Sequence, residues 1–384
     1  MSDKTTIGVG MIGYAFMGRV HSQAWRNVGA FFDLPLAPRM AVLGGRSKEH
    51  TAAAAARLGW ADVETDWREL VRRDDVQIVD ICTPGDSHAE IAVAALRAGK
   101  HVICEKPLAN TVAEAEAMVA AAASAPGRSM VAFNYRRVPA VALARRYVQE
   151  GRLGEIRHVR AQYLQDWIVD PEFPLVWRLQ KDKAGADALG DIGSHIVDAA
   201  EFVTGQHVVG VSGLMETFVK ERPLAGESAG LGGSRTEERG AVTVDDAALF
   251  IGRMSGGALA SFEATRFATG RKNAMRIEIN GQLGSLAFDF ESMNELWFSA
   301  GGGGFERILV TEPDHPYVGA WWPPGHGLGY EHTFTHEIKD FLEAVATGTD
   351  PEPSFADGLR VQRVLAAVEA GAADGSRFTT VEDS

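Results

Sequence analysis

Asp191 and His195, two side chains that together could bind a hydroxyl group and take its proton, stand four residues apart in the stretch ALGDIGSHIVD. If a helix begins there, both side chains share one face and converge on one ligand. A carboxylate can orient the hydroxyl while an imidazole accepts its proton near neutral pH. The spacing alone leaves a second interpretation open, in which the aspartate caps a helix and the histidine is a core residue.

Lys106 is a third side chain with chemical potential, in the tripeptide EKP that follows an apolar run. If that run is a strand of a parallel sheet, the lysine lies at the carboxyl edge of the sheet, where ligands of such sheets bind. A lysine before proline is more often a solvated loop residue. Its functional interpretation therefore depends on the elements around it.

The N-terminal stretch IGVGMIGYAFMGRVH carries a glycine fingerprint in two overlapping registers. One begins at Gly8 and matches G-x-G-x-x-G by letter, and the other comprises Gly13, Ala15 and Gly18, with alanine for the middle glycine. Such a fingerprint binds a pyrophosphate only between a strand and a helix N-terminus. Apolar residues precede only the second register and end at Ile12, so we predict that register, with Gly8 inside the strand.

The composition is that of an ordinary globular protein. A length of 384 residues predicts two domains. The chain has 38 basic and 51 acidic residues, a net charge of -13, which argues against a nucleic acid partner. It has no apolar run of about 18 residues and no basic leader followed by an apolar stretch. We therefore expect a cytoplasmic protein without a membrane partner.

Strand and helix signals alternate up to about residue 133 and predict an α/β fold. The expected strands lie at residues 6–12, 39–45, 61–64, 76–84, 101–107 and 129–134. The first expected helix ends at about residue 28, and the other four span 48–58, 66–73, 87–99 and 111–124. Ser87 is the expected cap of one helix, and Thr111 with Glu114 forms the capping box of another. The layout predicts an N-terminal Rossmann domain, residues 1–133, with a doubly wound parallel sheet.

After residue 134 a period-two pattern with glycine-containing turns predicts a C-terminal α/β domain, residues 134–384, with a large, mostly antiparallel open sheet. Its expected strands lie at 155–167, 243–253, 257–267, 274–290 and 295–300. Its expected helices lie at 139–150, 194–204 and 355–373, of which the last can pack back on the first domain. Residues 221–240 and 300–304 are expected to be flexible loops.

Five motifs occur in an order and at separations that resemble one known family: GYAFMGRVH, CTPGDSHAEIA, EKP, FNYRR and GDIGSH. Over nearly the whole chain the set resembles the glucose-fructose oxidoreductase, inositol dehydrogenase and MocA (Gfo/Idh/MocA) family of nicotinamide-dependent oxidoreductases. YLQDW, the WR pair at Trp177 and PSFADG are similar to segments of the family's sugar dehydrogenases. The resemblance implies a homodimer or homotetramer formed through the C-terminal sheet.

The resemblance also implies residue roles. The implied catalytic residues are Lys106, Asp191 and His195, with His195 as base and Asp191 as orienting substrate ligand; whether Lys106 or His195 holds the proton is open. The implied NAD(P)-binding residues are Gly13, Ala15, Phe16, Met17, Gly18, Arg46, Ser47, Thr83, Pro84, His88, Glu105 and Lys106. The implied residues for a sugar or polyol substrate are Tyr135, Arg136, Gln165, Asp166, Trp167, Trp177, Arg178, Asp191 and His195. A cis Lys106–Pro107 bond is implied as well.

Two departures from the family pattern bear on the cofactor. Ala15 stands where glycine is usual and would be strained if that position needed a left-handed backbone. At the end of the second strand, where NAD enzymes place an acid, the chain has Gly45, Arg46 and Ser47. An arginine and a hydroxyl suit a ribose 2′-phosphate, so NADP is favoured over NAD. Alternatively, Arg46 only stacks on adenine and the enzyme accepts both cofactors.

Two further groups of residues have weaker functional interpretations. His332 and His336 have the i, i+4 spacing of metal ligands. No H-E-x-x-H or cysteine cluster accompanies them and the implied chemistry needs no metal, so we expect none. Cys82 and Cys104 each end an apolar run and are expected to be unbonded core residues.

The favoured functional hypothesis is an oxidoreductase that moves a hydride between a sugar, anhydrosugar or polyol carbon and NAD(P). The alternative is a glycoside-cleaving enzyme of the same superfamily that oxidises the sugar transiently with bound NAD. A nonenzymatic redox-sensing role would not require Lys106, Asp191 and His195 together.

Overall fold

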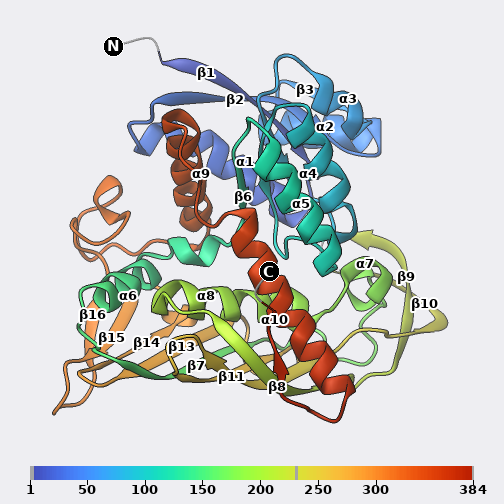
Figure 1. The fold of residues 1–384 in the computed structure, drawn as a ribbon. Coiled ribbons are helices and arrows are strands. Elements are labelled where there is room, and N and C mark those ends of the chain that lie inside the picture. Colours follow the sequence, from blue (N-terminus) through green and yellow to red (C-terminus); the bar gives the residue numbers. More distant parts are fainter. Residues whose placement is uncertain (1–3, 230–231, 383–384) are drawn as a thin grey trace. The chain divides into compact units, whose positions relative to one another are not determined.

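The computed structural model describes residues 4–229 and 232–382. The chain forms two compact units, residues 1–134 with 330–360 and residues 135–329 with 361–384 (Figure 1). Residues 330–360 thus fold with the N-terminal part, whereas the predicted linear division at 133/134 assigns them to the C-terminal domain. The boundary near 360 falls inside a helix. The functional division into a cofactor domain and a substrate domain stays a prediction.

The first unit is built on a six-stranded parallel sheet of order β3-β2-β1-β4-β5-β6. Its strands are β1 (Thr5–Ile12), β2 (Leu36–Gly44), β3 (Asp62–Glu64), β4 (Ile78–Ile81), β5 (His101–Cys104) and β6 (Ser129–Val131). The order reverses between β1 and β4, which is where a doubly wound sheet opens a ligand crevice beyond its strand ends. The predicted Rossmann sheet is confirmed.

Helices cover both faces of this sheet (Figure 1). They are α1 (Phe16–Phe31), α2 (Lys48–Leu58), α3 (Trp67–Arg72), α4 (His88–Arg97), α5 (Val112–Ser124), α9 (Tyr330–Thr347) and the start of α10 (Phe355–Ala373). The Thr111–Glu114 capping box of α5 is confirmed. The sequence analysis did not identify α9, which packs on α1 and buries Phe334, Ile338 and Phe341 in the core shared with Trp25.

Gly8 and Gly10 lie within β1, as the second fingerprint register predicts. A Cβ atom on Gly8 would stand 1.9 Å from the backbone oxygen of Asp75, and one on Gly10 would stand 2.7 Å from the Leu70 side chain. Both glycines therefore allow a neighbouring segment to approach the strand closely. They serve packing rather than ligand binding.

The second unit is built on a nine-stranded mixed sheet of order β16-β15-β14-β13-β7-β12-β11-β8-β17. Its strands are β7 (Ile156–Leu164), β8 (Val208–Glu216), β11 (Ala247–Met254), β12 (Leu259–Thr265), β13 (Ala274–Gly281), β14 (Ser285–Asp289), β15 (Glu295–Ser299), β16 (Glu306–Leu309) and β17 (Thr379–Thr380). All neighbouring pairs are antiparallel except β12 with β7. The predicted large, mostly antiparallel sheet is confirmed.

A β-hairpin corrects one loop prediction. Residues 221–240 were expected to be a flexible loop, but β9 (Glu221–Ala229) and β10 (Gly232–Ala241) pair antiparallel with two register irregularities. Glycine and serine concealed the strands because they weaken a period-two pattern. The residues 300–304 do form a loop between β15 and β16, as expected.

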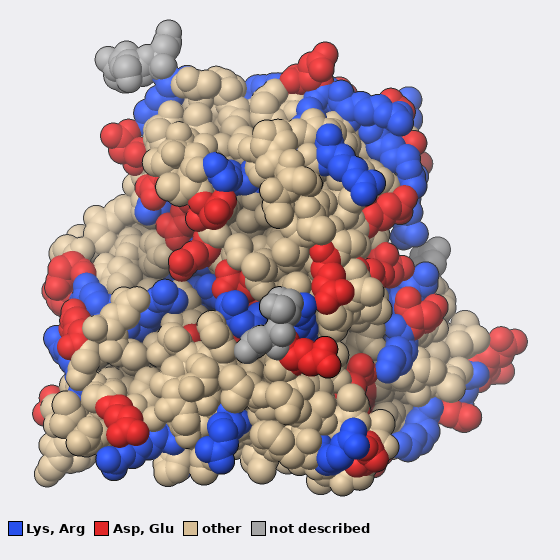
Figure 2. All heavy atoms as spheres, in the orientation of Figure 1, with Lys and Arg blue, Asp and Glu red and all other residues tan. Residues whose placement is uncertain are grey.

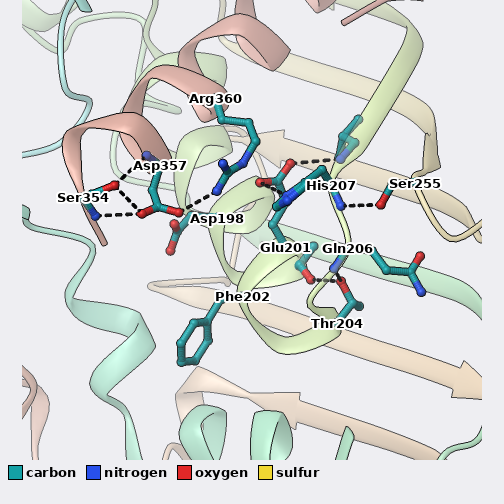
Figure 3. Close-up of polar contacts among 12 residues, drawn as sticks. Asp198, Glu201, Phe202, Thr204, Gln206, His207, Ser255, Ser354, Asp357 and Arg360 are labelled. Carbon is teal, nitrogen blue, oxygen red and sulfur yellow. Dashed lines mark hydrogen bonds and ion pairs between the residues drawn. The ribbon is translucent and has the colours of Figure 1, made fainter. Parts of the chain in front are cut away.

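The helical segments of the second unit are α6 (Pro139–Gln149), α7 (Lys181–Ala184), a π-helical turn η4 (Ala188–Gly193), α8 (Ser194–Thr204) and the rest of α10. The C-terminal end of α8 is firmly anchored (Figure 3). Glu201 accepts a hydrogen bond of 2.9 Å from the Val208 amide, and its other oxygen lies 3.4 Å from Nδ1 of His207. The helix that begins next to Asp191 is thus held in place at its far end.

Acidic and basic side chains are interspersed on the surface in view, without a large region of one sign (Figure 2). Among residues 4–229 and 232–382, no helix is both long and apolar enough to cross a bilayer.

Candidate active site

The turn after β1 has the geometry that a pyrophosphate-binding fingerprint requires. Gly13 has φ +100°, a backbone conformation that side chains rarely adopt, and a Cβ atom there would lie 2.5 Å from the Cys82 carbonyl oxygen. A Cβ atom on Gly18 would lie 2.1 Å from the Gly13 carbonyl oxygen. The two glycines therefore let helix α1 start directly against the ends of β1 and β4.

Ala15 is the N-cap of α1 and has φ −72°, so the strain that a left-handed backbone would cause does not arise. No side chain of the described residues caps α1, and its first turn contains no acidic residue. The first-turn N–H groups of a helix have no partner within the helix and carry its positive dipole end. This N-terminus therefore fits an anion such as the pyrophosphate of a dinucleotide.

Phe16 and Met17 follow Ala15 and occupy different surroundings. The Phe16 ring is 42% exposed and stacks on Tyr330 of α9 with 6.2 Å between ring centroids. The Met17 side chain packs against the core of the first unit. Met17 is only partly buried.

The residues after β2 only partly match the predicted 2′-phosphate site. Arg46 is exposed, so its guanidinium is available to a ligand. The Ser47 hydroxyl instead accepts a hydrogen bond of 3.4 Å from the His50 amide and caps α2. Gly45 lies against Tyr14, whose ring would be 2.2 Å from an added Cβ atom.

The loops after β4 and β5 are joined by a buried histidine. His88 Nδ1 lies 3.0 Å from the Pro107 carbonyl oxygen, and Nε2 lies 2.9 Å from that of Thr83. The predicted cofactor residues Thr83, Pro84 and His88 are therefore close in space, with the histidine linking main chains. The expected cis Lys106–Pro107 bond is present.

Ser87 does not cap α4, which corrects that prediction. Its hydroxyl donates to Thr83 Oγ1 at 2.7 Å or to the Pro84 carbonyl at 2.9 Å, and a short 3-10 turn (Gly85–Ser87) leads into the helix. Serine can satisfy backbone groups of a preceding turn as well as those of a following helix. The hydroxyl therefore stabilises the loop after β4.

The sequence analysis missed a buried polar cluster next to Lys106. It consists of His21, Asp80 and Glu105, and the Glu105 carboxylate also accepts a hydrogen bond of 3.1 Å from the Lys106 amide.

Burial raises the pKa values of the nearby Cys82 and Cys104 thiols, so both are neutral, unbonded core residues as expected. Within the described ranges, His21, Asp80 and Cys82 are also the only group that could surround a metal ion.

Asp191 and His195 lie on the helical segment predicted for them. Asp191 is in the π-helical turn and His195 in the first turn of α8. The start of the π turn is fixed by Asp245, whose carboxylate accepts hydrogen bonds of 3.0 Å from the Asp187 amide and 2.7 Å from the Leu189 amide. π turns within helices are frequent at functional sites.

Aromatic and amide side chains surround His195. Its ring stacks on Tyr135 with 4.4 Å between centroids. The Tyr135 and Tyr163 hydroxyls are 2.7 Å apart, and the Tyr163 hydroxyl donates to Asn273 at 2.7 Å. Asn273 also accepts a hydrogen bond of 2.9 Å from Gln165. The second unit therefore brings His195 together with two predicted substrate residues, Tyr135 and Gln165, and adds Tyr163 and Asn273, which the sequence analysis did not select.

Arg266 is the main residue that the sequence analysis missed in the second unit. Its buried guanidinium pairs with Asp187 and with Asp191, and it lies over the Trp167 ring at 4.8 Å. Trp167 in turn donates a hydrogen bond of 3.0 Å to Gln165. Burial raises the pKa of Asp187 to about 8, with Arg266 acting in the opposite direction. The buried Arg266 guanidinium thus holds Asp191 in place and links it to Trp167.

The other predicted substrate residues have structural partners. Arg136 is buried and forms a bidentate pair with Asp198, with Nε 3.0 Å from each carboxylate oxygen. Asp166 pairs with Lys272 at 2.7 Å, and the hydrogen bond from that lysine lowers its pKa. Arg178 lies 4.3 Å over the Trp177 ring. Arg136 and Asp166 therefore each have an oppositely charged partner within the second unit.

His332 and His336 have different surroundings on α9. His336 is fully buried, and its ring meets Phe32 edge to face at 6.0 Å between centroids. His332 lies 3.6 Å from Glu331. The i, i+4 spacing here follows from helix packing.

A doubly wound sheet with a glycine turn at its switch point defines a dinucleotide-binding domain, and a paired carboxylate and imidazole in the following unit suit an oxidoreductase. The family model described as "Oxidoreductase family, NAD-binding Rossmann fold" of GFO/IDH/MocA matches residues 7–133, and the GFO/IDH/MocA C-terminal domain model matches residues 141–287. The chain belongs to the Gfo/Idh/MocA oxidoreductase family. The predicted family, fold class and enzyme class are confirmed.

Individual relatives resemble the chain over almost its full length. Levoglucosan dehydrogenase of Pseudarthrobacter phenanthrenivorans is 44% identical over 380 residues, which cover 96% of this chain and 97% of the relative. A solved oxidoreductase domain protein from Kribbella flavida is 65% identical, with a TM-score of 0.95 and coverage of 99% and 100%. Levoglucosan dehydrogenase in complex with NADH and levoglucosan is 41% identical, with a TM-score of 0.93 and the same coverage.

Proposed function

We propose that the protein is a dehydrogenase of sugars or anhydrosugars of the levoglucosan type, with Lys106, Asp191 and His195 at its catalytic centre. The observation that carries this proposal is the network of the second unit. His195 stacks on Tyr135 there, and Arg266 links Asp191 to Trp167, which donates a hydrogen bond to Gln165. Hydroxyl-binding groups beside flat aromatic rings suit a sugar, which has both polar and apolar faces. The similarity to levoglucosan dehydrogenase supports the same substrate class.

Each of the three proposed catalytic residues has its own role in the reaction. Asp191, fixed by Arg266, accepts a hydrogen bond from the substrate hydroxyl and orients it. His195, held against Tyr135, accepts the proton of the reacting hydroxyl, and Lys106 stabilises the oxygen as negative charge develops. Hydride acceptance is the chemistry that a nicotinamide cofactor would supply here when bound.

The first unit would hold the cofactor through the turn of Gly13, Ala15 and Gly18. The adenosine end would lie near Arg46 and Ser47, and the nicotinamide end near Thr83 and Glu105. The NADP preference predicted from Arg46 has no support from the solved relatives, whose complexes contain NADH. Replacing Arg46 with Ala tests it: if Arg46 binds a 2′-phosphate, kcat/KM falls for NADP and not for NAD.

The deciding experiment is a panel of anhydrosugars, sugars and inositols assayed by nicotinamide absorbance with each cofactor. Accumulation of free reduced cofactor with an anhydrosugar supports the dehydrogenase, and turnover without it supports transient oxidation in a glycoside-cleaving enzyme. Lys106→Ala should abolish turnover while nucleotide affinity is retained. Binding of neither NAD nor NADP in a titration would overturn the proposal.

We also propose that the outer face of the nine-stranded sheet joins copies of this chain. Four aliphatic side chains on neighbouring strands are exposed there: Leu214 (67%), Leu249 (50%), Ile251 (61%) and Leu259 (51%). Leu249 lies directly opposite Leu214 in the β11–β8 ladder, and Ile251 follows on the same face. An apolar sheet face of this kind is typical of an interface between subunits.

Sedimentation velocity tests this interface. Ile251→Lys should shift the protein toward monomer, because a charge would have to be buried without a partner. Leu283→Lys is the matched control, since Leu283 is equally exposed, at 56%, but lies in the turn between β13 and β14. An oligomer unaffected by Ile251→Lys, or a monomeric wild type, would contradict the proposal.

A further inference from the structure

His21 is a fully buried histidine whose two ring nitrogens both face carboxylates. It lies in α1, just after the glycine turn. Nδ1 lies 3.0 Å from both oxygens of Asp80 in β4, and Nε2 lies 2.9 Å from Oε1 of Glu105, which directly follows β5. One imidazole thereby connects the fingerprint helix with the ends of two central strands.

This geometry specifies a protonation state. A neutral imidazole has one N–H donor and one lone pair, and a lone pair directed at an ionised carboxylate is repelled. Each ring nitrogen of His21 lies at hydrogen-bond distance from a carboxylate oxygen, so both ring nitrogens carry hydrogen. His21 is then an imidazolium between two carboxylates.

The surroundings of the ring agree with this charge. The Trp25 indole donates a hydrogen bond of 2.7 Å to Asp80 Oδ2, and the Cys82 thiol lies 3.4 Å from Oδ1. Phe334 of α9 has no charged or hydrogen-bonding side-chain group, and its ring centroid lies 5.4 Å from that of His21. Burial, the largest single influence, lowers the pKa of His21, but the adjacent Asp80 and Cys82 side chains together raise the pKa well above its usual value.

The remaining oxygen of Glu105 connects the cluster to the lysine. Oε2 accepts a hydrogen bond of 3.1 Å from the main-chain N–H of Lys106, while Oε1 is held by His21. The Glu105 carboxylate therefore cannot rotate without breaking one of two hydrogen bonds. Without the imidazolium, Asp80 and Glu105 would each lose a buried hydrogen-bond donor, and the Glu105 carboxylate would no longer be held on both sides.

We propose that His21 is a positioning residue, which acts as an imidazolium to fix Glu105 and, through it, the main chain of Lys106. This inference rests on the proposed catalytic role of Lys106. His21 itself, being fully buried, does not touch the substrate. Its effect on the reaction passes through Glu105, which makes the effect measurable as coupling between the two residues.

A double-mutant cycle in the full-length protein tests the inference. His21→Gln has a side-chain amide that cannot donate to both carboxylates, and it should lower kcat by about 10- to 100-fold, the order expected when a catalytic group is misplaced. KM for the sugar and Kd for NADH should change by less than about threefold. In a Glu105→Gln background the same replacement should have little further effect, because its route to Lys106 is already interrupted.

Trp25→Phe is the matched control. It removes a buried donor to Asp80 but leaves the links from His21 to Glu105 and Lys106 intact. It should lower thermal stability and leave kcat within about twofold of wild type, as expected for a lost hydrogen bond outside the reaction. If Trp25→Phe lowers kcat as much as His21→Gln, the cluster has only a structural role and the proposal is wrong.

Two outcomes would overturn the inference directly. One is a kcat loss from His21→Gln that is equally large with and without Glu105. The other is a neutron structure of the wild-type protein with deuterium on only one ring nitrogen of His21, a measurement that needs no folded variant. If the wild type itself oxidised no sugar, the proposed function would fail, while the neutron result would still decide the charge of His21.

Discussion

Arg266 Nη2 lies 3.0 Å from Asp187 Oδ1, and the two side chains are 2% and 1% exposed. The same guanidinium pairs with the more exposed Asp191. A buried cation beside the Asp187 carboxyl group and the Asp191 carboxylate stabilises only if its geometry is precise, and removing it leaves Asp191 without its charged partner. Arg266 is therefore placed to determine where the Asp191 carboxylate lies.

Replacing Arg266 with Lys should lower kcat by about 10- to 100-fold, because lysine keeps the charge but lacks the rigid planar guanidinium that lies over Trp167 and holds Nη2 against both Asp187 and Asp191. NADH affinity should be unchanged, since Arg266 belongs to the second unit. Steady-state kinetics and nucleotide titration measure the two effects separately. Equal losses of nucleotide affinity and kcat would indicate general unfolding instead.

Asp187→Asn should change how stability depends on pH. Burial raises the pKa of Asp187 from 3.8 to about 8, so the folded protein binds this proton more tightly than the unfolded chain does. The stabilisation is complete below about pH 4 and is lost as pH rises through 8. Asparagine stays neutral, so melting temperatures should favour the variant increasingly from pH 5 to pH 9. A difference independent of pH would show that Asp187 is already ionised throughout.

Gly18→Ala should weaken cofactor binding strongly, although it adds only one methyl group. The added methyl group would lie 2.1 Å from the Gly13 carbonyl oxygen, a backbone atom that can move only if the pyrophosphate turn opens. Ala15→Gly is the control, because Ala15 has an ordinary φ of −72° and loses only a methyl group. Isothermal titration with NADH should show at least about tenfold weaker binding for Gly18→Ala, which costs about 1.4 kcal/mol, and little change for Ala15→Gly.

Local signals predicted much of the fold. The predicted bounds of α2, 48–58, are those of the structure, in which Ser47 caps the start of the helix and Gly59, in the left-handed conformation, ends it. The fingerprint register followed from the apolar strand before Gly13. The strands at 221–240 could not be recognised, because glycine and charged residues there conceal the alternation that marks a strand.

The supporting residues of the site could not be predicted from local patterns. His21 lies 59 positions from Asp80 and 84 from Glu105, and Arg266 lies 75 positions from Asp191. In the sequence, each is an ordinary polar residue of a helix or a strand end. Only the fold shows that each is a buried cation facing carboxylates.

Gly8→Ala distinguishes the two glycine registers by experiment. Gly8→Ala would place a methyl group 1.9 Å from the Asp75 carbonyl oxygen, so β1 or the segment before β4 must shift. We expect a loss of about 1–3 kcal/mol in the free energy of unfolding, the order of overpacking in a core. Gly29→Ala is the matched control, since no atom lies within 4 Å of the added Cβ, and a helix gains about 1 kcal/mol from that change. Urea unfolding measures both, and the folded Gly8→Ala protein should still bind NADH with near wild-type affinity. A selective loss of NADH binding at unchanged stability would instead place Gly8 in the pyrophosphate turn.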